Sequence, residues 1–236
     1  MPICIWEFST STSRIFLLFA QKIGGDLIFK SFVSLSKVSL NMILVSVAIF
    51  YGRNIVTPVL TVYFKDVIKL SYSQVGYLYS LYLFVMFATD IFTGGIADKY
   101  GRRRTLVLGL IFYGVSMFLI SLSKGFAFCV FAYALAAVGS SLISGTLRAW
   151  YFTEVEKQNM AREEAKNAFG LLKSINSAGS LVIGLVNSVI IAYLGMRSVF
   201  YAAAVLNLLA ALLALLLLPE NWGDKKKNVL AIVIEG

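Results

Sequence analysis

The chain alternates long apolar runs with short polar breaks. Apolar runs of about 20 residues recur between residues 40 and 218, and each is long enough to cross the hydrocarbon core as a helix. A barrel strand would alternate apolar and polar residues, and the run LNLLAALLALLLL before Pro219 does not. We therefore predict an all-α membrane protein with six transmembrane helices, over residues 40–64, 72–98, 104–122, 126–151, 167–193 and 198–218.

Basic residues are distributed unequally between the two predicted sides. One side holds Lys99, the run Arg102–Arg104 and the run Lys225–Lys227, among others, whereas the other side holds only Lys65, Lys69, Lys124 and Arg197. By the positive-inside rule the richer side is cytoplasmic, and an even number of spans places both termini there.

The same pattern divides the chain into three parts, in what we expect to be the plasma membrane. A cytoplasmic N-terminal segment (1–39) is either an interfacial helix or a poorly ordered extension, because apolar residues alternate there with lysines. The transmembrane domain occupies 40–220, and a cytoplasmic tail follows at 221–236.

Composition agrees with a membrane protein and narrows the chemistry. Hydrophobic residues make up 59% of the chain and charged residues 14%, and the mean hydropathy is +0.82. The chain has no histidine, and Cys4 and Cys129 are far apart, so we expect no metal site, no cofactor and no enzyme. The net charge of +9 is explained by topology and anionic lipid headgroups, and we expect no nucleic-acid partner.

The segment GGIADKYGRRRTL lies between the second and third predicted spans. Gly94 allows close helix approach, Asp98 closes the span, Gly101 permits a tight turn, and Arg102–Arg104 anchor the next helix at the cytoplasmic surface. This segment resembles, at corresponding positions, the signature of the major facilitator superfamily of transporters, and other segments extend the resemblance over residues 40–220.

The resemblance implies a fold and a function. In that family two inverted three-helix repeats make one six-helix half, and two halves make a secondary transporter that moves a small solute by alternating access. It also implies a cytoplasmic gate formed by Gly94, Asp98, Gly101, Arg102 and Arg103. We predict that Glu154 and Glu156, at the cytoplasmic end of the fourth span, are the partners of these arginines; the alternative is an exposed loop pair.

The chain has the spans of one half only, so two interpretations stay open. In the first it is a half-transporter that pairs with a second copy or with another six-helix half. In the second it is a truncated remnant or a non-transporting membrane subunit. Two features are also missing. The family's fourth helix often carries an arginine four residues before a glycine, and Leu135 stands at that place before Gly139; the fifth span has no proline, unlike the glycine signature of many drug and proton antiporters.

Three charged residues fall inside predicted spans, where charges are costly and therefore functional candidates: Arg53, Asp90 and Arg148. Arg53, Thr57 and Thr61 are four residues apart and form one polar stripe on the first span. Arg53 is predicted either to hold an anionic or polar substrate or to make a structural pair or hydrogen bond. The predicted substrate cavity, with a small solute and a coupling ion as its expected ligands, comprises Arg53, Asn54, Thr57, Thr61, Asp90, Arg148 and Asn176. Asp90 and Arg148 lie at similar depth, which predicts a buried pair.

Overall fold

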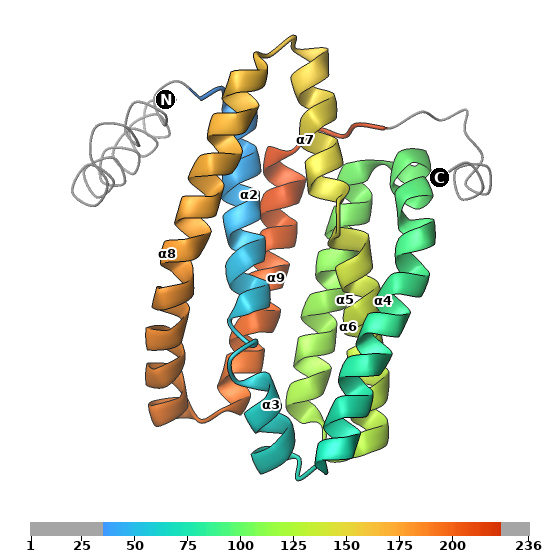
Figure 1. Cartoon of the computed structure of the whole chain (residues 1–236), viewed down its shortest axis with the longest axis vertical. Coiled ribbons are helices and arrows are strands. Elements are labelled where there is room, and N and C mark those ends of the chain that lie inside the picture. The colour runs from blue at the N-terminus through green and yellow to red at the C-terminus, as the bar shows by residue number, and fades with distance from the viewer. Residues whose placement is uncertain (1–34, 223–236) are drawn as a thin grey trace, which may run out of the picture.

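The computed structural model describes residues 35–222 as a bundle of helices (Figure 1). The predicted N-terminal segment and C-terminal tail lie almost wholly outside the described residues. The helical elements, in chain order, are α2 (Lys37–Asn54), α3 (Leu60–Val62), the π-helix η1 (Tyr63–Val67), α4 (Tyr72–Tyr100), α5 (Arg102–Leu122), α6 (Phe126–Ile143), α7 (Thr146–Lys157), α8 (Arg162–Leu194) and α9 (Arg197–Leu217).

The expectation of an all-helical membrane protein is confirmed for the part of the chain described. Five stretches are long and apolar enough to cross a membrane, namely α4, α5, the α6–α7 stretch Phe126–Lys157, α8 and α9. The first predicted span, 40–64, is interrupted, because α2 ends at Asn54 and helix resumes only at Leu60. Pro58 lies in this break, and proline cannot donate the backbone hydrogen bond that a continuous helix needs.

Two buried asparagines satisfy carbonyl groups at the broken end of α2. Asn187 Nδ2 in α8 donates to the carbonyl oxygen of Ile55 over 2.7 Å, and Asn207 Nδ2 in α9 donates to that of Gly52 over 2.8 Å. Lipid offers no hydrogen bonds, so a helix can be broken in the membrane only where other groups replace the lost partners.

The fourth predicted span is also broken. Helix α6 ends at Ile143 and α7 begins at Thr146, with Gly145 between them at φ 73°. Only glycine adopts this left-handed conformation without strain, so Gly145 allows α7 to leave the axis of α6.

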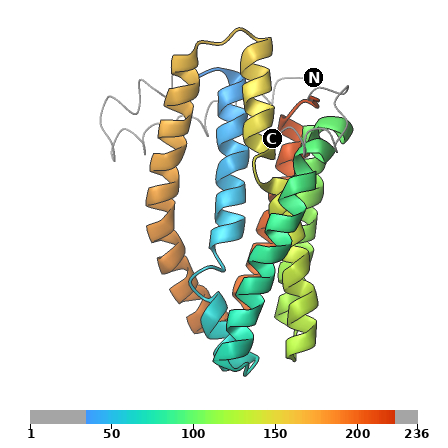
Figure 2. The same ribbon diagram turned by 45° about the vertical axis from the view of Figure 1, so that its right-hand side comes forward.

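Helix α5 lies at the centre of the bundle and packs on α6 and α9, while α2 packs on α9 and α8. Helices α4 and α8 lie at opposite edges (Figure 1) and are far less covered: in an apolar 18-residue window of each helix, 61% of the residues are buried in α5, against 11% in α4 and 17% in α8. Figure 2 shows α8 running apart from the other helices over much of its length. One face of the bundle is therefore left open between α4 and α8.

One end of the bundle collects the basic motif. The α4–α5 turn, the α7–α8 loop and the chain after α9 lie together there, at the top of Figure 1. We call this the basic end. Here α8 is attached to α2, because Glu164 Oε1 accepts hydrogen bonds from the backbone N–H of Ser36 over 2.7 Å and from the hydroxyl of Ser39 over 2.8 Å.

Candidate functional site

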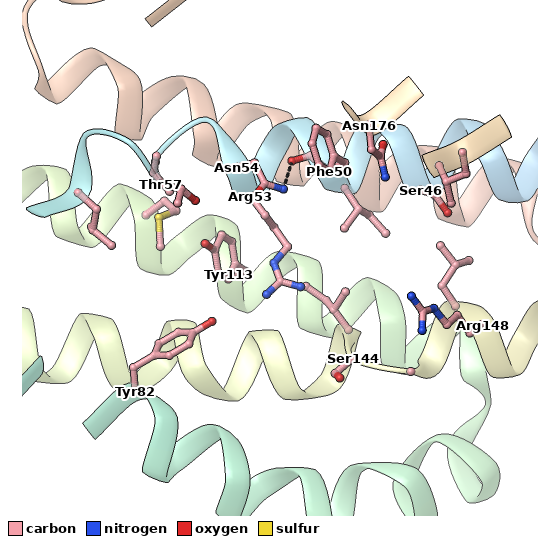
Figure 3. A pocket seen from close by; sticks show the side chains of 18 of the residues that line it. Ser46, Phe50, Arg53, Asn54, Thr57, Tyr82, Tyr113, Ser144, Arg148 and Asn176 are labelled. Atoms are coloured by element: carbon pink, nitrogen blue, oxygen red, sulfur yellow. Dashed lines mark hydrogen bonds between the residues drawn. The ribbon is translucent and has the colours of Figure 1, made fainter. Parts of the chain in front are cut away.

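A cavity of about 760 Å³ opens on the face between α4 and α8 (Figure 3). It is walled by α2, α4, α5, the α6–α7 break and α8. Five predicted residues line it: Arg53, Asn54, Thr57, Arg148 and Asn176. The breaks in α2 and between α6 and α7 both contribute to its wall, through residues such as Thr57 and Gly145. Arg53 and Thr57 from the first predicted span and Arg148 from the fourth therefore face the same space.

Two predicted cavity residues lie outside this lining. Thr61 is exposed and its hydroxyl lies 2.9 Å from the hydroxyl of Tyr79, which itself lines the cavity. Asp90 is exposed on α4 and is not part of either cavity wall described here. The break after Asn54 accounts for Thr61, since the four-residue spacing with Arg53 holds only along a continuous helix.

Arg53 is held by neutral groups. Its Nη2 donates to Ser140 Oγ over 3.1 Å, and that oxygen lies 2.6 Å from the hydroxyl of Tyr82. The guanidinium carbon lies 5.4 Å from the centre of the Tyr113 ring, within reach of a cation–π interaction. No carboxylate among residues 35–222 forms an ion pair with Arg53. Its positive charge in the cavity is therefore not neutralised by this part of the chain.

The predicted Asp90–Arg148 pair is absent from the ion pairs formed within residues 35–222. Asp90 and Arg148 would lie at equal depth only if the fourth span were one straight helix, and the break at Gly145 interrupts that helix. Arg148 extends from α7 towards the space that Arg53 enters from α2 (Figure 3).

A second cavity, of about 620 Å³, continues the first between α2, α7 and α8. The two share Phe50, Arg148, Phe169, Leu172 and Asn176. The residues that only the second contains are Phe152, Lys173, Ser177 and Ser180. Sequence reasoning missed these four; the recurrence of Lys173, Asn176, Ser177 and Ser180 at three- and four-residue spacing on α8 was the available signal.

At the basic end Arg102 joins three elements. Its Nη2 lies 2.9 Å from Asp98 Oδ1 at the end of α4, and the Asp98–Arg102 ion pair bridges the turn that Gly101 makes at φ 104°. Arg102 Nη1 donates to the carbonyl of Ala149 over 2.7 Å and to the hydroxyl of Thr153, both in α7. Arg102 thus ties the α4–α5 turn to α7.

The prediction that Glu154 and Glu156 are the partners of these arginines is wrong for the part of the chain described. Glu154 lies 3.2 Å from Lys157 and accepts a hydrogen bond from Asn221, and Glu156 is exposed. The carboxylate that Arg103 contacts is Glu220, which accepts from the Arg103 backbone N–H over 3.0 Å and lies 3.5 Å from its Nε. Glu220 was missed because it follows the last span, where the sequence indicates only the start of a polar tail.

Residues 218–222, which follow α9, lie at the basic end and form a segment that we call the strap. Trp150 Nε1 donates to the Pro219 carbonyl over 2.8 Å, and Asn221 Nδ2 returns a bond to the Trp150 carbonyl over 3.0 Å. The Arg102 backbone N–H donates to the Asn221 carbonyl over 3.0 Å. The strap therefore connects α7 with the α4–α5 turn.

Gly94 has a different environment from Gly101. A Cβ atom on Gly101 would lie 2.5 Å from Glu220 Oε1, whereas one on Gly94 would meet no atom of the described residues within 4 Å. The close helix approach expected at Gly94 is therefore not made inside this part of the chain, and its face of α4 is open.

The chain is similar in sequence to known bacterial proteins. The chain is 26% identical over 182 residues to "Multidrug resistance protein 2" of Bacillus subtilis (strain 168). The aligned region covers 77% of this chain and 44% of that protein. It is 26% identical over 172 residues to "Quinolone resistance protein NorA" of Staphylococcus aureus, covering 73% of this chain and 42% of the relative. The chain thus spans less than half the length of these relatives.

The family profile described as "Major Facilitator Superfamily" matches residues 42–231, which include the broken first helix, the motif at the basic end and the strap. The chain belongs to the Major Facilitator Superfamily and is a multi-pass membrane protein.

Proposed function

We propose that this chain provides one half of a secondary active transporter that moves a small organic solute by alternating access. The observation that carries the proposal is the cavity between α4 and α8, whose wall holds Arg53 and Arg148 without a carboxylate partner among residues 35–222. A lipid anchor has no need of such charges, because each is costly in the bilayer unless it serves a site. Family membership and the relatives' names, which concern drug resistance, support the same proposal.

The half consists, in this proposal, of six spans arranged as two inverted three-helix repeats. The first span is the broken element from α2 through η1, and the α6–α7 stretch is the fourth. Two broken spans at corresponding places in the two repeats are typical of transporters that bind solute near the middle of the bilayer.

A second six-helix half closes the cavity. The open face between the sparsely covered α4 and α8, together with the free surface at Gly94, supports a large apolar partner at this place. The partner is a second copy of the chain or a different six-helix half, and an ion gradient supplies the energy.

The basic end faces the cytoplasm of a plasma-membrane protein, with both termini on that side. Single cysteines test this orientation in a chain in which Cys4 and Cys129 are replaced by serine. We expect Lys157→Cys to react with a membrane-impermeant maleimide only after the membrane is opened, and Lys124→Cys, at the opposite end, to react in intact cells. Reaction of the Lys157 position in intact cells would reverse the assignment.

Flux measurements test the transport proposal. Proteoliposomes holding the chain, with and without an imposed proton or sodium gradient, are assayed with a panel of labelled organic solutes, and cysteine crosslinking from α4 and α8 reports a second half. We expect gradient-driven flux that falls at least about tenfold in Arg53→Met, because removal of a cavity charge weakens solute binding. Lys166→Gln, which changes a basic residue that is 78% exposed and lies outside both cavity linings, is the matched control. A monomeric chain with no flux above empty liposomes would favour the alternative, a non-transporting subunit.

A further inference from the structure

We infer that the site binds an organic anion with a flat apolar body, such as an aromatic carboxylate, and that Arg148 and Lys173 receive its charge. This inference rests on the proposed function and names the substrate class of the same site. The shared wall of the two cavities carries it, in particular the side chains on α7 and α8.

The linings of the two cavities carry an excess of positive charge. The cations that line the two cavities are Arg53, Arg148 and Lys173, and none of the described residues lining either cavity is Asp or Glu. Arg53 is already engaged by Ser140 and the Tyr113 ring. Arg148 and Lys173, by contrast, have neither a hydrogen bond nor an ion pair with the described residues. The site therefore presents two cations without any such contact, Arg148 and Lys173, in addition to Arg53, whose charge is contacted by neutral groups.

Arg148 and Lys173 lie at similar distances from the basic end of the bundle. From Lys157 at the end of α7 to Arg148 the helix rises about 14 Å, and from Arg162 at the start of α8 to Lys173 about 16 Å. The two cations thus lie at similar depth on adjacent walls, two to three helical turns inside the basic end. Bare cations at that depth are unfavourable, and an anionic ligand relieves the cost.

The cavity wall around Arg148 and Lys173 is aromatic, with one polar amide. The rings of Phe152 and Phe169 have centroids 5.7 Å apart, and Phe50 completes an aromatic surface from α2. Asn176 lines both cavities beside Lys173, and its buried Oδ1 has no hydrogen-bond partner among the described residues. Because Oδ1 is an acceptor, a bound water rather than the carboxylate of the ligand would satisfy it, while the aromatic walls favour a flat apolar body.

Equilibrium binding to the purified chain in phosphatidylcholine nanodiscs tests the inference with three aromatic probes of one ring system. These are 1-naphthoate, neutral 1-naphthamide and the cation 1-naphthylmethylammonium. We expect the carboxylate to bind at least about tenfold more tightly than the amide, and the cation to bind most weakly. Equal binding of the three, a preference for the cation, or no carboxylate binding up to about 1 mM would overturn the inference.

Matched variants assign the charges. We expect Arg148→Gln to abolish the preference for the carboxylate, Lys173→Gln to reduce it several-fold, and Arg148→Lys to keep part of it, since a lysine retains charge without the planar fork. Lys166→Gln is the control on the same helix: its side chain is 78% exposed and lies outside both cavities. A preference that survives in both the Arg148→Gln and Lys173→Gln variants would place the anion elsewhere and contradict the assignment.

An anionic lipid headgroup shares this chemistry, so a second arm adds phosphatidylglycerol to the nanodiscs. Unchanged naphthoate binding supports a soluble organic anion, and full displacement by the lipid overturns it in favour of a lipid site. The flux assay separates this inference from the proposed function. Gradient-driven flux without a charge preference contradicts only the substrate class, whereas anion binding without flux contradicts only transport.

Discussion

Asn207 and Asn187 hold the end of the broken first helix, and each does so through one buried amide. Asn207 Nδ2 donates over 2.8 Å both to Gly52 in α2 and to Ala203 in its own helix. A Cβ atom on Gly52 would lie only 2.9 Å from this nitrogen, so Gly52 is small where the amide must approach. Apolar α9 carries a polar residue here because the break in α2 exposes a carbonyl inside the membrane.

We expect Asn207→Ala to destabilise the folded chain by about 1–3 kcal/mol, because the Gly52 carbonyl loses its buried donor. Thermal unfolding in detergent, followed by the loss of native fluorescence, measures the change. Ser188→Ala is the control, since the exposed Ser188 hydroxyl donates only to the Gly184 carbonyl of its own helix. Equal stability of the two variants would show that the amide does not support the break.

At the scale of elements, glycines set the closest approach between α5 and α6. A Cβ atom on Gly139 would lie 2.7 Å from the backbone nitrogen of Tyr113, and one on Gly109 would lie 2.9 Å from the Gly139 carbonyl. Backbone atoms cannot move aside as a flexible side chain does, so these positions admit no larger residue. In membrane helices such contacts replace the hydrophobic effect as the source of association.

Gly139→Ala is therefore expected to lower stability by about 1–3 kcal/mol through overpacking. Gly184→Ala makes the same substitution on α8, where no atom of residues 35–222 beyond the adjoining turns of α8 lies within 4 Å of the added methyl group, and should be neutral or mildly stabilising. The midpoint of thermal unfolding in the same detergent compares the two variants. A stability loss of the same size in both would contradict the packing explanation.

At the scale of the whole molecule, the basic end is joined by side chains from parts of the sequence that are far apart. Arg102 connects the α4–α5 turn with α7, and Glu220 connects the same turn with the strap after α9. Among residues 35–222, the open face between α4 and α8 has no comparable set of connecting side-chain contacts. A bundle fastened at one end and open along one face is suited to rocking against a second half, which the alternating access proposed above requires.

Glu220→Gln tests the role of the strap. The substitution removes the charge that Arg103 and Arg104 contact at 3.5 and 3.6 Å, and we expect faster amide hydrogen exchange, by several-fold, in the α4–α5 turn and in the strap. Glu156→Gln changes an exposed carboxylate nearby and should leave exchange unaltered. Unchanged exchange in Glu220→Gln would mean that the backbone bonds of the strap suffice.

The apolar runs by themselves determined the helical membrane fold, and the spacing of the motif around Asp98 indicated the family. These features are local: about 20 apolar residues must span lipid wherever they are placed, and a turn of fixed length needs glycine and anchoring arginines in fixed positions. Helical periodicity also predicted that Arg53 and Thr57 face one space, but Thr57 lies beyond the end of α2 at Asn54, so the tertiary structure places it in the cavity wall.

Only the tertiary structure decided which charges meet. Glu220 rather than Glu154 or Glu156 contacts Arg103, and Arg148 faces a cavity with Lys173 rather than a pair with Asp90. These outcomes depend on where α2 and the fourth span break and on how the chain returns after α9. Partner choice between residues far apart in sequence follows from that packing, because an ion pair forms only where the folded backbone brings two side chains within a few ångströms.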